Sequence, residues 1–566
     1  MKKAYPGHYV KQFTDLRDLA KTSAEAFGDK DLYTYKRHEE NVVVTYNQFY
    51  DYVRCLGTAF HKLGFAESTV VMTGENHPAY SVTYIATIAA GGVIVPLDKD
   101  IKDDEMPAFI SKCRTRAVFF TNAMFDKIVP MFEKLSAVEM FVCIDFDKEE
   151  RPNDPRFKTF DEIIEVGKAA LEEGDTSFDD YEFDMSKLAA IIFTSGTTGT
   201  SKGVMLSHYN LVKATLASDS MIAYDDTTSF VSVLPMHHTY EMTCAHLGTI
   251  NLGASTFFND GIKYTMRNLS AVKPNAMVFV PLYVETIYKR IFDELEKKGM
   301  ANKVRALMKM SDGMRKIGID TRRKLFKPIL EALGGRLESI ICGGAPLPRK
   351  IMEDFESLGI TILEGYGITE CAPLVSCNTF GWKKFGSVGL PVPGCEVKID
   401  KADGEETGEI LVKGPNVMMG YYEDPEATAA VFTEDGWFRT GDIGYIDEDG
   451  FIYITGRKKN IILLSNGKNI FPEELEEYLV HCSSVSEVVV IGRKDDKGET
   501  KITAVVYPNK ENITGESDDE IYAAVKADVD ALNKTLPVFK HITDIEIRAE
   551  EFEKTTSRKI KRYKVK

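Results

Sequence analysis

The stretch Thr194-Ser-Gly-Thr-Thr-Gly-Thr-Ser-Lys-Gly203 combines glycines and hydroxyl side chains with one lysine. Its glycines allow several backbone N–H groups to converge on an anion, and its hydroxyls add further donors. Lys202 supplies the countercharge. The segment therefore predicts a polyphosphate site, hence a nucleotide, with a flexible surface linker as the alternative.

The residues on either side of this stretch place it within an α/β framework. An apolar run of strand length, Leu188-Ala-Ala-Ile-Ile-Phe193, precedes it, and Ser207 is followed by a helical pattern that it would cap. We therefore expect the loop to join a strand to a helix, where phosphate loops are common. A Walker A loop is excluded because it needs glycine at 201 and a hydroxyl at 203, where this chain has Ser201 and Gly203.

Length and composition indicate a large soluble protein of several domains. The chain has 566 residues, of which 44% are hydrophobic and 28% charged, and its formal charge of −16 argues against nucleic-acid binding. Nine scattered cysteines without a C-x-x-C pair favour reduced thiols in a cytoplasm over disulfides or a zinc site. The N-terminal Met-Lys-Lys-Ala-Tyr-Pro-Gly-His has no apolar core of signal-peptide length, so export is not expected.

Apolar runs alternate with amphipathic stretches through most of the chain, which predicts an α/β fold. The uncharged segment 76–97 predicts a buried helix, a turn and a strand rather than a membrane span, and the acidic residues 147–186 predict a surface excursion. We expect a large N-terminal domain of αβ-layered sheets over 1–458, with a small β-rich subdomain at about 394–458. A small mobile C-terminal α/β domain should follow over 459–566, with helices near 472–480 and 518–532 and strands near 487–491 and 502–506.

Residues 297–327 form a basic helical stretch in an otherwise acidic chain, with eleven lysines and arginines against only Asp312 and Asp320. A solvated helical face is one interpretation. Contact with anionic lipid at the inner membrane face, or with an acidic partner, is the other.

Further glycine-rich segments lie downstream, and their order strengthens the nucleotide prediction. They are Gly343-Gly-Ala-Pro-Leu, Glu364-Gly-Tyr-Gly-Ile-Thr-Glu370, Phe438-Arg-Thr-Gly-Asp442, Gly456-Arg-Lys-Lys459, Ser465-Asn-Gly-Lys-Asn-Ile-Phe-Pro472 and Lys554-Thr-Thr-Ser-Arg-Lys-Ile-Lys-Arg562. Together with the first stretch they resemble the adenylate-forming superfamily, which includes acyl-CoA synthetases, peptide-synthetase adenylation domains and beetle luciferases. The resemblance is specific over about 190–562.

This resemblance implies a role for each matching residue. Lys202, Thr369, Glu370 and Lys559 would be catalytic, with Glu370 also ligating Mg²⁺ and Lys559 reaching the substrate carboxylate and the α-phosphate. Lys459 would be the hinge of the C-terminal domain. The residues implied to bind ATP or coenzyme A are Thr194, Ser195, Gly196, Thr197, Thr198, Gly199, Gly344, Ala345, Glu364, Gly365, Tyr366, Gly367, Asp442, Arg457, Gly467 and Lys468. The family pattern has proline at 201 and glycine at 558, where this chain has Ser201 and Arg558.

The segments expected to form the acyl-binding side of the site are most similar to those of bacterial long-chain fatty-acid–CoA ligases. His238 and Pro281 match the acyl side of the family's site, whereas a metal site at His237 and His238 is not expected, since adjacent strand residues point to opposite faces. The resemblance implies ATP- and Mg²⁺-dependent activation of a medium- or long-chain fatty acid to acyl-AMP, then transfer to coenzyme A. An acyl carrier protein as acceptor, and a non-catalytic AMP or acyl-AMP sensor of the same fold, are the alternatives.

Overall fold

The computed structural model describes residues 7–182, 184–194, 201–464, 469–494, 499–513, 515, 517–554 and 560–565. The chain divides into two compact units. The first comprises Met1–Thr194, Ser201–Glu396 and Lys413–Ala430, and the second includes Val397–Val412 and Val431–Lys566. The structure confirms the predicted α/β class, and each unit is described by itself.

The largest sheet of the first unit has eight strands in the order β19-β9-β8-β4-β3-β5-β6-β7. Its strands are β19 (Gly420–Tyr421), β9 (Lys202–Ser207), β8 (Leu188–Thr194), β4 (Val93–Leu97), β3 (Thr69–Thr73), β5 (Ala117–Phe120), β6 (Met140–Cys143) and β7 (Phe157–Thr159). The pairs from β8 to β7 are parallel, whereas β8 with β9 and β9 with β19 are antiparallel. Every residue of β5 and β6 is buried, as expected for parallel strands covered on both faces.

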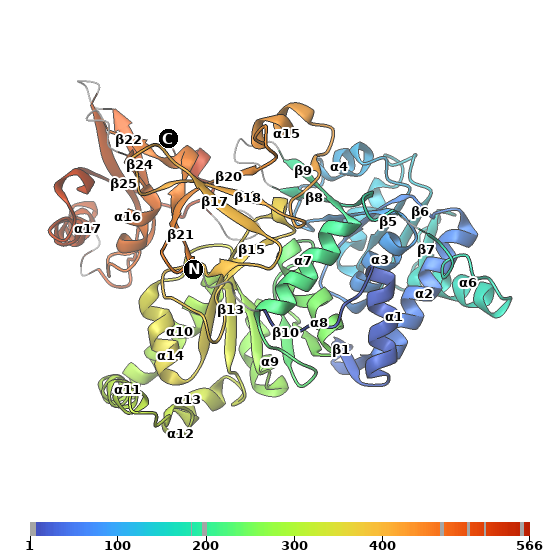
Figure 1. Ribbon diagram of the computed structural model, residues 1–566, viewed down its shortest axis with the longest axis horizontal. Helices are drawn as coiled ribbons and strands as arrows, with labels where there is room; N and C mark the ends of the chain where they lie inside the picture. Colours follow the sequence, from blue (N-terminus) through green and yellow to red (C-terminus); the bar gives the residue numbers. More distant parts are fainter. Residues whose placement is uncertain are drawn as a thin grey trace. The chain divides into compact units, whose positions relative to one another are not determined.

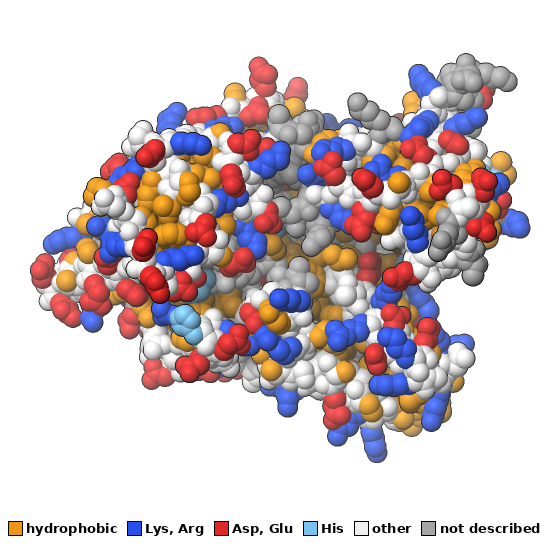
Figure 2. Space-filling view, turned by 180° about the vertical axis from the view of Figure 1, so that it is seen from behind, with side chains coloured by type: hydrophobic (Ala, Val, Ile, Leu, Met, Phe, Trp, Pro, Cys, Tyr) orange, Lys and Arg blue, Asp and Glu red, His pale blue; other side chains and the backbone are white. Residues whose placement is uncertain are grey.

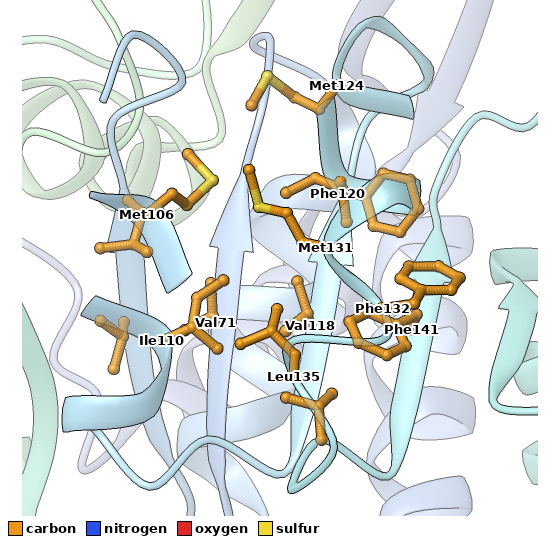
Figure 3. Close-up of a cluster of buried hydrophobic side chains, with 14 of the residues drawn as sticks. Val71, Met106, Ile110, Val118, Phe120, Met124, Met131, Phe132, Leu135 and Phe141 are labelled. Atoms are coloured by element: carbon orange, nitrogen blue, oxygen red, sulfur yellow. The ribbon is translucent and has the colours of Figure 1, made fainter. Parts of the chain in front are cut away.

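Helices cover both faces of this sheet (Figure 1). On one side lie α1 (Leu16–Phe27), α2 (Tyr46–Leu63), α3 (Pro78–Ala89) and α6 (Phe160–Glu172). On the other side, α4 (Met106–Lys112) and α5 (Phe125–Ile128) contribute to a core of methionines, aliphatic residues and phenylalanines. Figure 3 shows this core, in which the stacked rings of Phe132 and Phe141 have centroids 3.9 Å apart.

For this half of the chain, one prediction is confirmed and another is wrong. Residues 76–97 form the helix α3 followed by β4, as predicted, and in the described residues no helix has the length and apolarity that a bilayer span requires. The prediction of a surface excursion over 147–186 is wrong, because β7 extends the sheet and α6 packs on α2. A Cβ atom at Gly167 of α6 would lie 1.8 Å from the carbonyl oxygen of Cys55, so only glycine permits this close packing.

Two smaller sheets complete the first unit. The five-stranded sheet is ordered β12 (Ala276–Phe279), β13 (Ser339–Gly343), β14 (Thr361–Gly367), β15 (Leu374–Cys377) and β16 (Leu390–Pro391). The four-stranded sheet is ordered β10 (Ser229–Ser232), β11 (Ser255–Phe258), β1 (Asp31–Arg37) and β2 (Glu40–Thr45). β12, β13 and β14 are parallel with Gly343 opposite Gly365, so these glycine-rich segments meet at one edge of the sheet. Open α/β sheets bind ligands at such edges.

The helices near the five-stranded sheet hold its core and extend into the basic segment. They are α9 (Thr265–Val272), α10 (Pro281–Lys297), α11 (Ala301–Arg315), α12 (Arg322–Leu325), α13 (Lys327–Ala332) and α14 (Arg349–Leu358). Figure 1 shows α11, α12 and α13 on the outside of this group. The basic segment is therefore helical, as predicted.

The second unit is β-rich at its start and α/β towards its end. One sheet contains β17 (Glu396–Asp400), β18 (Gly408–Lys413), β20 (Phe438–Ile446) and β21 (Ile452–Arg457). The other contains β24 (Val485–Lys494), β25 (Thr500–Pro508) and β26 (Asp544–Ile547), accompanied by α16 (Pro472–Leu479) and α17 (Asp518–Asn533). The predicted helices and strands of this region are confirmed. The exact domain boundaries at 394, 458 and 459 stay predictions.

Candidate functional site

The predicted phosphate loop begins and ends on a β-hairpin. Thr194, the last residue of β8, pairs with Lys202, the first residue of β9. The expectation that the loop joins a strand to a helix is wrong, because residues 202–207 form an antiparallel strand between the loop and the helix, with Val204 and Leu206 buried. Ser207 then caps α7 (His208–Met221) in a capping box with Asn210. The predicted ligands Ser195, Gly196, Thr197, Thr198 and Gly199 lie outside the described residues.

Lys202 lies against an aromatic ring that the sequence did not single out. Its Nζ atom is 4.6 Å from the centroid of Tyr421, which lies on β19 opposite Val204 of β9. An ammonium over a tyrosine face is an attractive cation–π contact, and it holds the long lysine side chain in a defined position.

The same tyrosine links Lys202 to Glu370. Tyr421 donates a hydrogen bond of 2.9 Å from its hydroxyl to Glu370 Oε1, and the Met418 backbone N–H donates to the Glu370 carbonyl at 2.8 Å. Burial, together with the neighbouring Glu370 carboxylate, raises the pKa of Tyr421 well above its ordinary value. The phenol therefore stays protonated and remains a donor to the carboxylate.

Glu370 has the chemistry and the open coordination position needed for a magnesium ion. It lies in the 3₁₀ turn η5 (Thr369–Cys371), half-buried, and its Oε2 atom accepts no hydrogen bond from any described residue. No group of three or more candidate metal ligands occurs in the described residues. Proteins commonly hold Mg²⁺ through one or two carboxylates while substrate phosphates and water fill the other positions.

The other residues of the first unit that are predicted to bind the nucleotide gather around the ends of β13 and β14. Gly344 and Ala345 are exposed just beyond β13, with Gly344 at φ +88°, and Tyr366 on β14 is only 6% exposed. Glu364 is buried, and its Oε1 atom accepts a hydrogen bond of 3.4 Å from the Leu347 N–H. The structure thus brings these glycines and the tyrosine together at one sheet edge.

An apolar cavity of about 90 Å³ opens at this edge. Its lining includes Gly343, Gly344, Gly365 and Gly367. Other lining residues come from α7 and the residue after it, from the π-helix η3 (Tyr240–Leu247) and from α8 (Gly248–Leu252). They include Asp219, Met221, Ile222, Tyr240, Cys244, Thr249 and Leu252. The cavity therefore shares four glycines with the predicted nucleotide motifs.

Asp219 is the charged exception in this apolar lining. Its side chain is buried and accepts a hydrogen bond of 2.8 Å at Oδ2 from Asn251. Burial raises the pKa of Asp219 to about 7, because one hydrogen bond does not replace the lost hydration. The carboxyl is therefore neutral for much of its population near pH 7. No local signal in the sequence marks this residue, since a lone aspartate in a helical pattern is usually on the surface.

The predicted acyl residues His238 and Pro281 do not belong to the lining of this cavity. Pro281 is the first residue of α10, and His238 lies in a turn before η3. The expectation that His237 and His238 point apart is wrong, because their rings lie 4.1 Å apart in that turn. Burial and the neighbouring His238 lower the pKa of His237 well below its ordinary value. These rings form no metal cluster within the described residues.

In the second unit, the two residues that are predicted to contact the ribose form an ion pair with each other. Asp442 on β20 is the cross-strand partner of Arg457 on β21, and Arg457 Nε lies 2.7 Å from Asp442 Oδ1. Lys459 follows in the 3₁₀ turn η6 (Lys458–Asn460), where burial and the nearby Arg457 charge lower its pKa. Gly467, Lys468 and Lys559 lie outside the described residues.

Comparison with protein families decides the class. The family model of AMP-binding enzymes matches residues 20–422, and that of the AMP-binding enzyme C-terminal domain matches residues 459–566. The chain belongs to the AMP-binding enzymes. It is therefore an adenylate-forming, acyl-activating ligase of the acid–thiol type, with the large N-terminal and small C-terminal domains of that superfamily.

Curated and structural relatives agree with this assignment. The chain is 28% identical to human long-chain-fatty-acid–CoA ligase ACSBG1, over 83% of this chain and 67% of the relative. It is 26% identical to the Arabidopsis thaliana long-chain-fatty-acid–[acyl-carrier-protein] ligase AEE15, over 87% and 76%. Its fold matches the Bacillus subtilis O-succinylbenzoate coenzyme A synthetase in complex with ATP and magnesium ion, at 20% identity and a TM-score of 0.71 over 96% and 98% of the two chains.

Proposed function

We propose that this AMP-binding enzyme activates a medium- or long-chain fatty acid with ATP and transfers the acyl group to coenzyme A. The observation that carries the proposal is the Lys202–Tyr421–Glu370 arrangement in the same unit as an apolar cavity lined by glycines of the predicted nucleotide motifs. A cation and a carboxylate able to bind metal suit a triphosphate, and an apolar cavity suits an acyl chain. The fatty-acid ligases among its relatives support the substrate class.

In the first half-reaction a carboxylate oxygen of the acid attacks the α-phosphorus of ATP, and pyrophosphate leaves with the electrons of the broken P–O bond. Lys202 would neutralise the phosphates, and Thr369 would contact the α-phosphate. Glu370 would hold Mg²⁺, which screens the charge of the phosphate oxygens when bound. Lys559 would lie between the two approaching anions, where a placed ammonium lowers the barrier electrostatically. The adenosine would be held by Tyr366 at its base and by Asp442 and Arg457 at its ribose.

In the second half-reaction the coenzyme A sulfur attacks the acyl carbonyl carbon, and AMP leaves as the C–O bond breaks. Gly467 and Lys468 would line the passage for the pantetheine arm, and Lys459 would serve as the hinge that exchanges the two half-reactions. Nine free thiols support a reducing cytoplasm as the site of action.

The cavity bears on the length of the acyl chain. At about 90 Å³ it is smaller than the roughly 150 Å³ of an engineered cavity that admits benzene. A medium-length chain therefore requires its surrounding side chains to move on binding. Each methylene that is then buried contributes about 0.8 kcal/mol, so efficiency should rise steeply from acetate to dodecanoate.

AMP release over a panel of acids, from acetate through palmitate to cinnamate, tests the proposal. Each acid is assayed with coenzyme A, with a phosphopantetheinylated acyl carrier protein, and with neither. Equal efficiency for acetate and dodecanoate would refute the fatty-acid assignment. Turnover with the carrier protein but not with coenzyme A would favour the carrier protein as acceptor, and no AMP release with any acid would favour an AMP or acyl-AMP sensor.

A further inference from the structure

The basic segment 297–327 contains two kinds of cation with different roles. Its arginines are engaged within the fold. Arg315 and Arg322 each place Nη1 2.9 Å from Glu356 Oε1, and Arg323 donates hydrogen bonds to the carbonyls of Leu337 and Gly335. These contacts tie α11 and α12 to the rest of the unit, so the arginines do not account for the positive character of the outer surface.

The lysines of the segment are directed to solvent instead. Within the described residues, five of them are exposed and have no carboxylate within 4 Å: Lys297, Lys303, Lys309, Lys316 and Lys324. Both acidic residues of the segment are already paired, Asp312 with Arg315 and Asp320 with Arg322. The outer surface therefore carries uncompensated positive charge on a protein whose formal charge is −16.

Exposed apolar side chains lie among these lysines. Met310 is 49% exposed, and Ile317 and Ile319, just after α11, are 74% and 50% exposed. At 3.6 residues per turn, Ala306, Met310 and Gly313 lie on one face of α11. Lys303 borders this face on one side and Lys309 on the other. Figure 2 shows blue and orange side chains intermixed at the lower right, where the turned view places α11–α13.

We propose that this outer face of α11, with the 316–319 segment after it, docks on an anionic lipid bilayer. Lysines that flank an apolar strip suit the interface, since the ammonium groups meet lipid headgroups while methionine and isoleucine enter the acyl boundary. Protein interfaces favour arginine and aromatic residues and are poor in lysine. In this segment the arginines are engaged within the fold, and lysine, methionine and isoleucine remain outside. Such a bilayer repels the acidic remainder of the protein. This face therefore determines how the protein is oriented on the bilayer.

Vesicle co-sedimentation of the full-length protein tests the proposal. Vesicles of equal parts phosphatidylglycerol and phosphatidylcholine are compared with vesicles of phosphatidylcholine alone. The protein should sediment with the anionic vesicles only, and added salt should weaken the binding because it screens exposed charges. The K303E/K309E/K316E variant should lose at least about tenfold in affinity, and M310D/I317D should lose binding with the lysines intact.

The matched control is K21E/K112E/K134E, which changes the net charge equally at exposed lysines elsewhere in the same unit. It should retain binding, and all variants should keep the wild-type melting temperature and AMP release. Equal losses in the control and the patch variant would overturn the proposal, as would equal binding of wild type to both vesicle types. The lipid assignment would also fail if wild type bound no vesicles and the patch variant lost turnover only with an acidic carrier protein.

Discussion

Replacing Asp219 by asparagine tests the electrostatic account of the cavity. The carboxyl is buried against α8, where a Cβ on Gly248 would approach Asp219 Oδ1 to 2.6 Å, and its hydrogen bond comes from Asn251. Asparagine has nearly the same shape and can still accept that hydrogen bond through its side-chain oxygen, but it cannot ionise. The substitution therefore removes the charge and little else.

The expected change in the free energy of unfolding follows from the difference in the pKa of Asp219 between the folded and unfolded states. The folded pKa of about 7 exceeds the ordinary value of 3.8, so the folded state holds its proton more tightly. The associated stability is fully present below about pH 4 and is lost as the pH rises through about 7. A pKa difference of about three corresponds to about 4 kcal/mol, of which about 2 kcal/mol is lost between about pH 5.5 and pH 8.5. Asp219→Asn should abolish this loss.

The assay uses the distribution of the two tryptophans. Trp382 lies in the first unit and Trp437 in the second, so a Trp437→Phe background leaves Trp382 fluorescence as a reporter of the first unit. Urea unfolding is then measured against pH for this parent and for the parent carrying Asp219→Asn. The free energy of unfolding of the variant should increase relative to that of the parent as the pH rises. Asp225→Asn is the control, because hydrogen bonding to Thr227 lowers the pKa of that carboxylate, and its removal should not stabilise the unit at high pH.

Parallel pH profiles for parent and Asp219→Asn would refute the reasoning, because a carboxyl with an ordinary pKa gives no differential slope. A second readout concerns substrate binding. If the cavity receives the acyl chain, ionised Asp219 should raise the KM for a fatty acid above about pH 7, and this rise should be absent in Asp219→Asn.

Three further substitutions concern the reaction itself. Tyr421→Phe removes the hydrogen bond to Glu370 but keeps the ring beneath Lys202. The adenylation rate should therefore fall by about two- to tenfold, and pyrophosphate exchange should require a higher Mg²⁺ concentration. An unchanged dependence on Mg²⁺ would contradict the link to Glu370. Lys559→Ala should greatly impair acyl-AMP formation while thioester formation from supplied acyl-AMP continues, and wild-type pyrophosphate exchange would count against its role. Lys459→Pro should slow coenzyme A transfer far more than adenylation on folded protein, whereas equal losses would remove the case for a hinge.

Local patterns in the sequence predicted most elements but not how they combine. Segment 76–97 carries its own turn signals, so its helix and strand could be predicted. Strand β9 could not, because the same residues that precede a capped helix acquire partners from β8 only in the folded sheet. The acidic composition of 147–186 concealed α6, whose apolar positions matter only against α2. Burial of one helix face outweighs the average polarity of a segment.

The candidate site likewise contains residues that the sequence predicted and residues that it did not. Glycine-rich motifs indicated the residues at the ends of β13 and β14, since backbone approach to a ligand leaves a local signature. Tyr421 left none, because it meets Glu370 from 51 positions away along the chain and Lys202 through a neighbouring strand. Asp219 was equally hidden, as its altered chemistry comes entirely from burial. Residues whose role depends on tertiary contact lie beyond any local pattern.

The glycines of these motifs have a second physical reason to be glycine. A Cβ at Gly367 would lie 2.5 Å from the Pro373 carbonyl oxygen, and one at Gly343 would come within 3.3 Å of the Tyr240 ring. Both glycines and both partner residues border the apolar cavity. Their missing side chains therefore keep the cavity open at the sheet edge that also carries Gly344 and Tyr366. Under the proposed function, an acid whose chain enters the cavity would have its carboxylate towards the predicted nucleotide residues. The same sheet edge would then both select the acid and align it for attack on the α-phosphate.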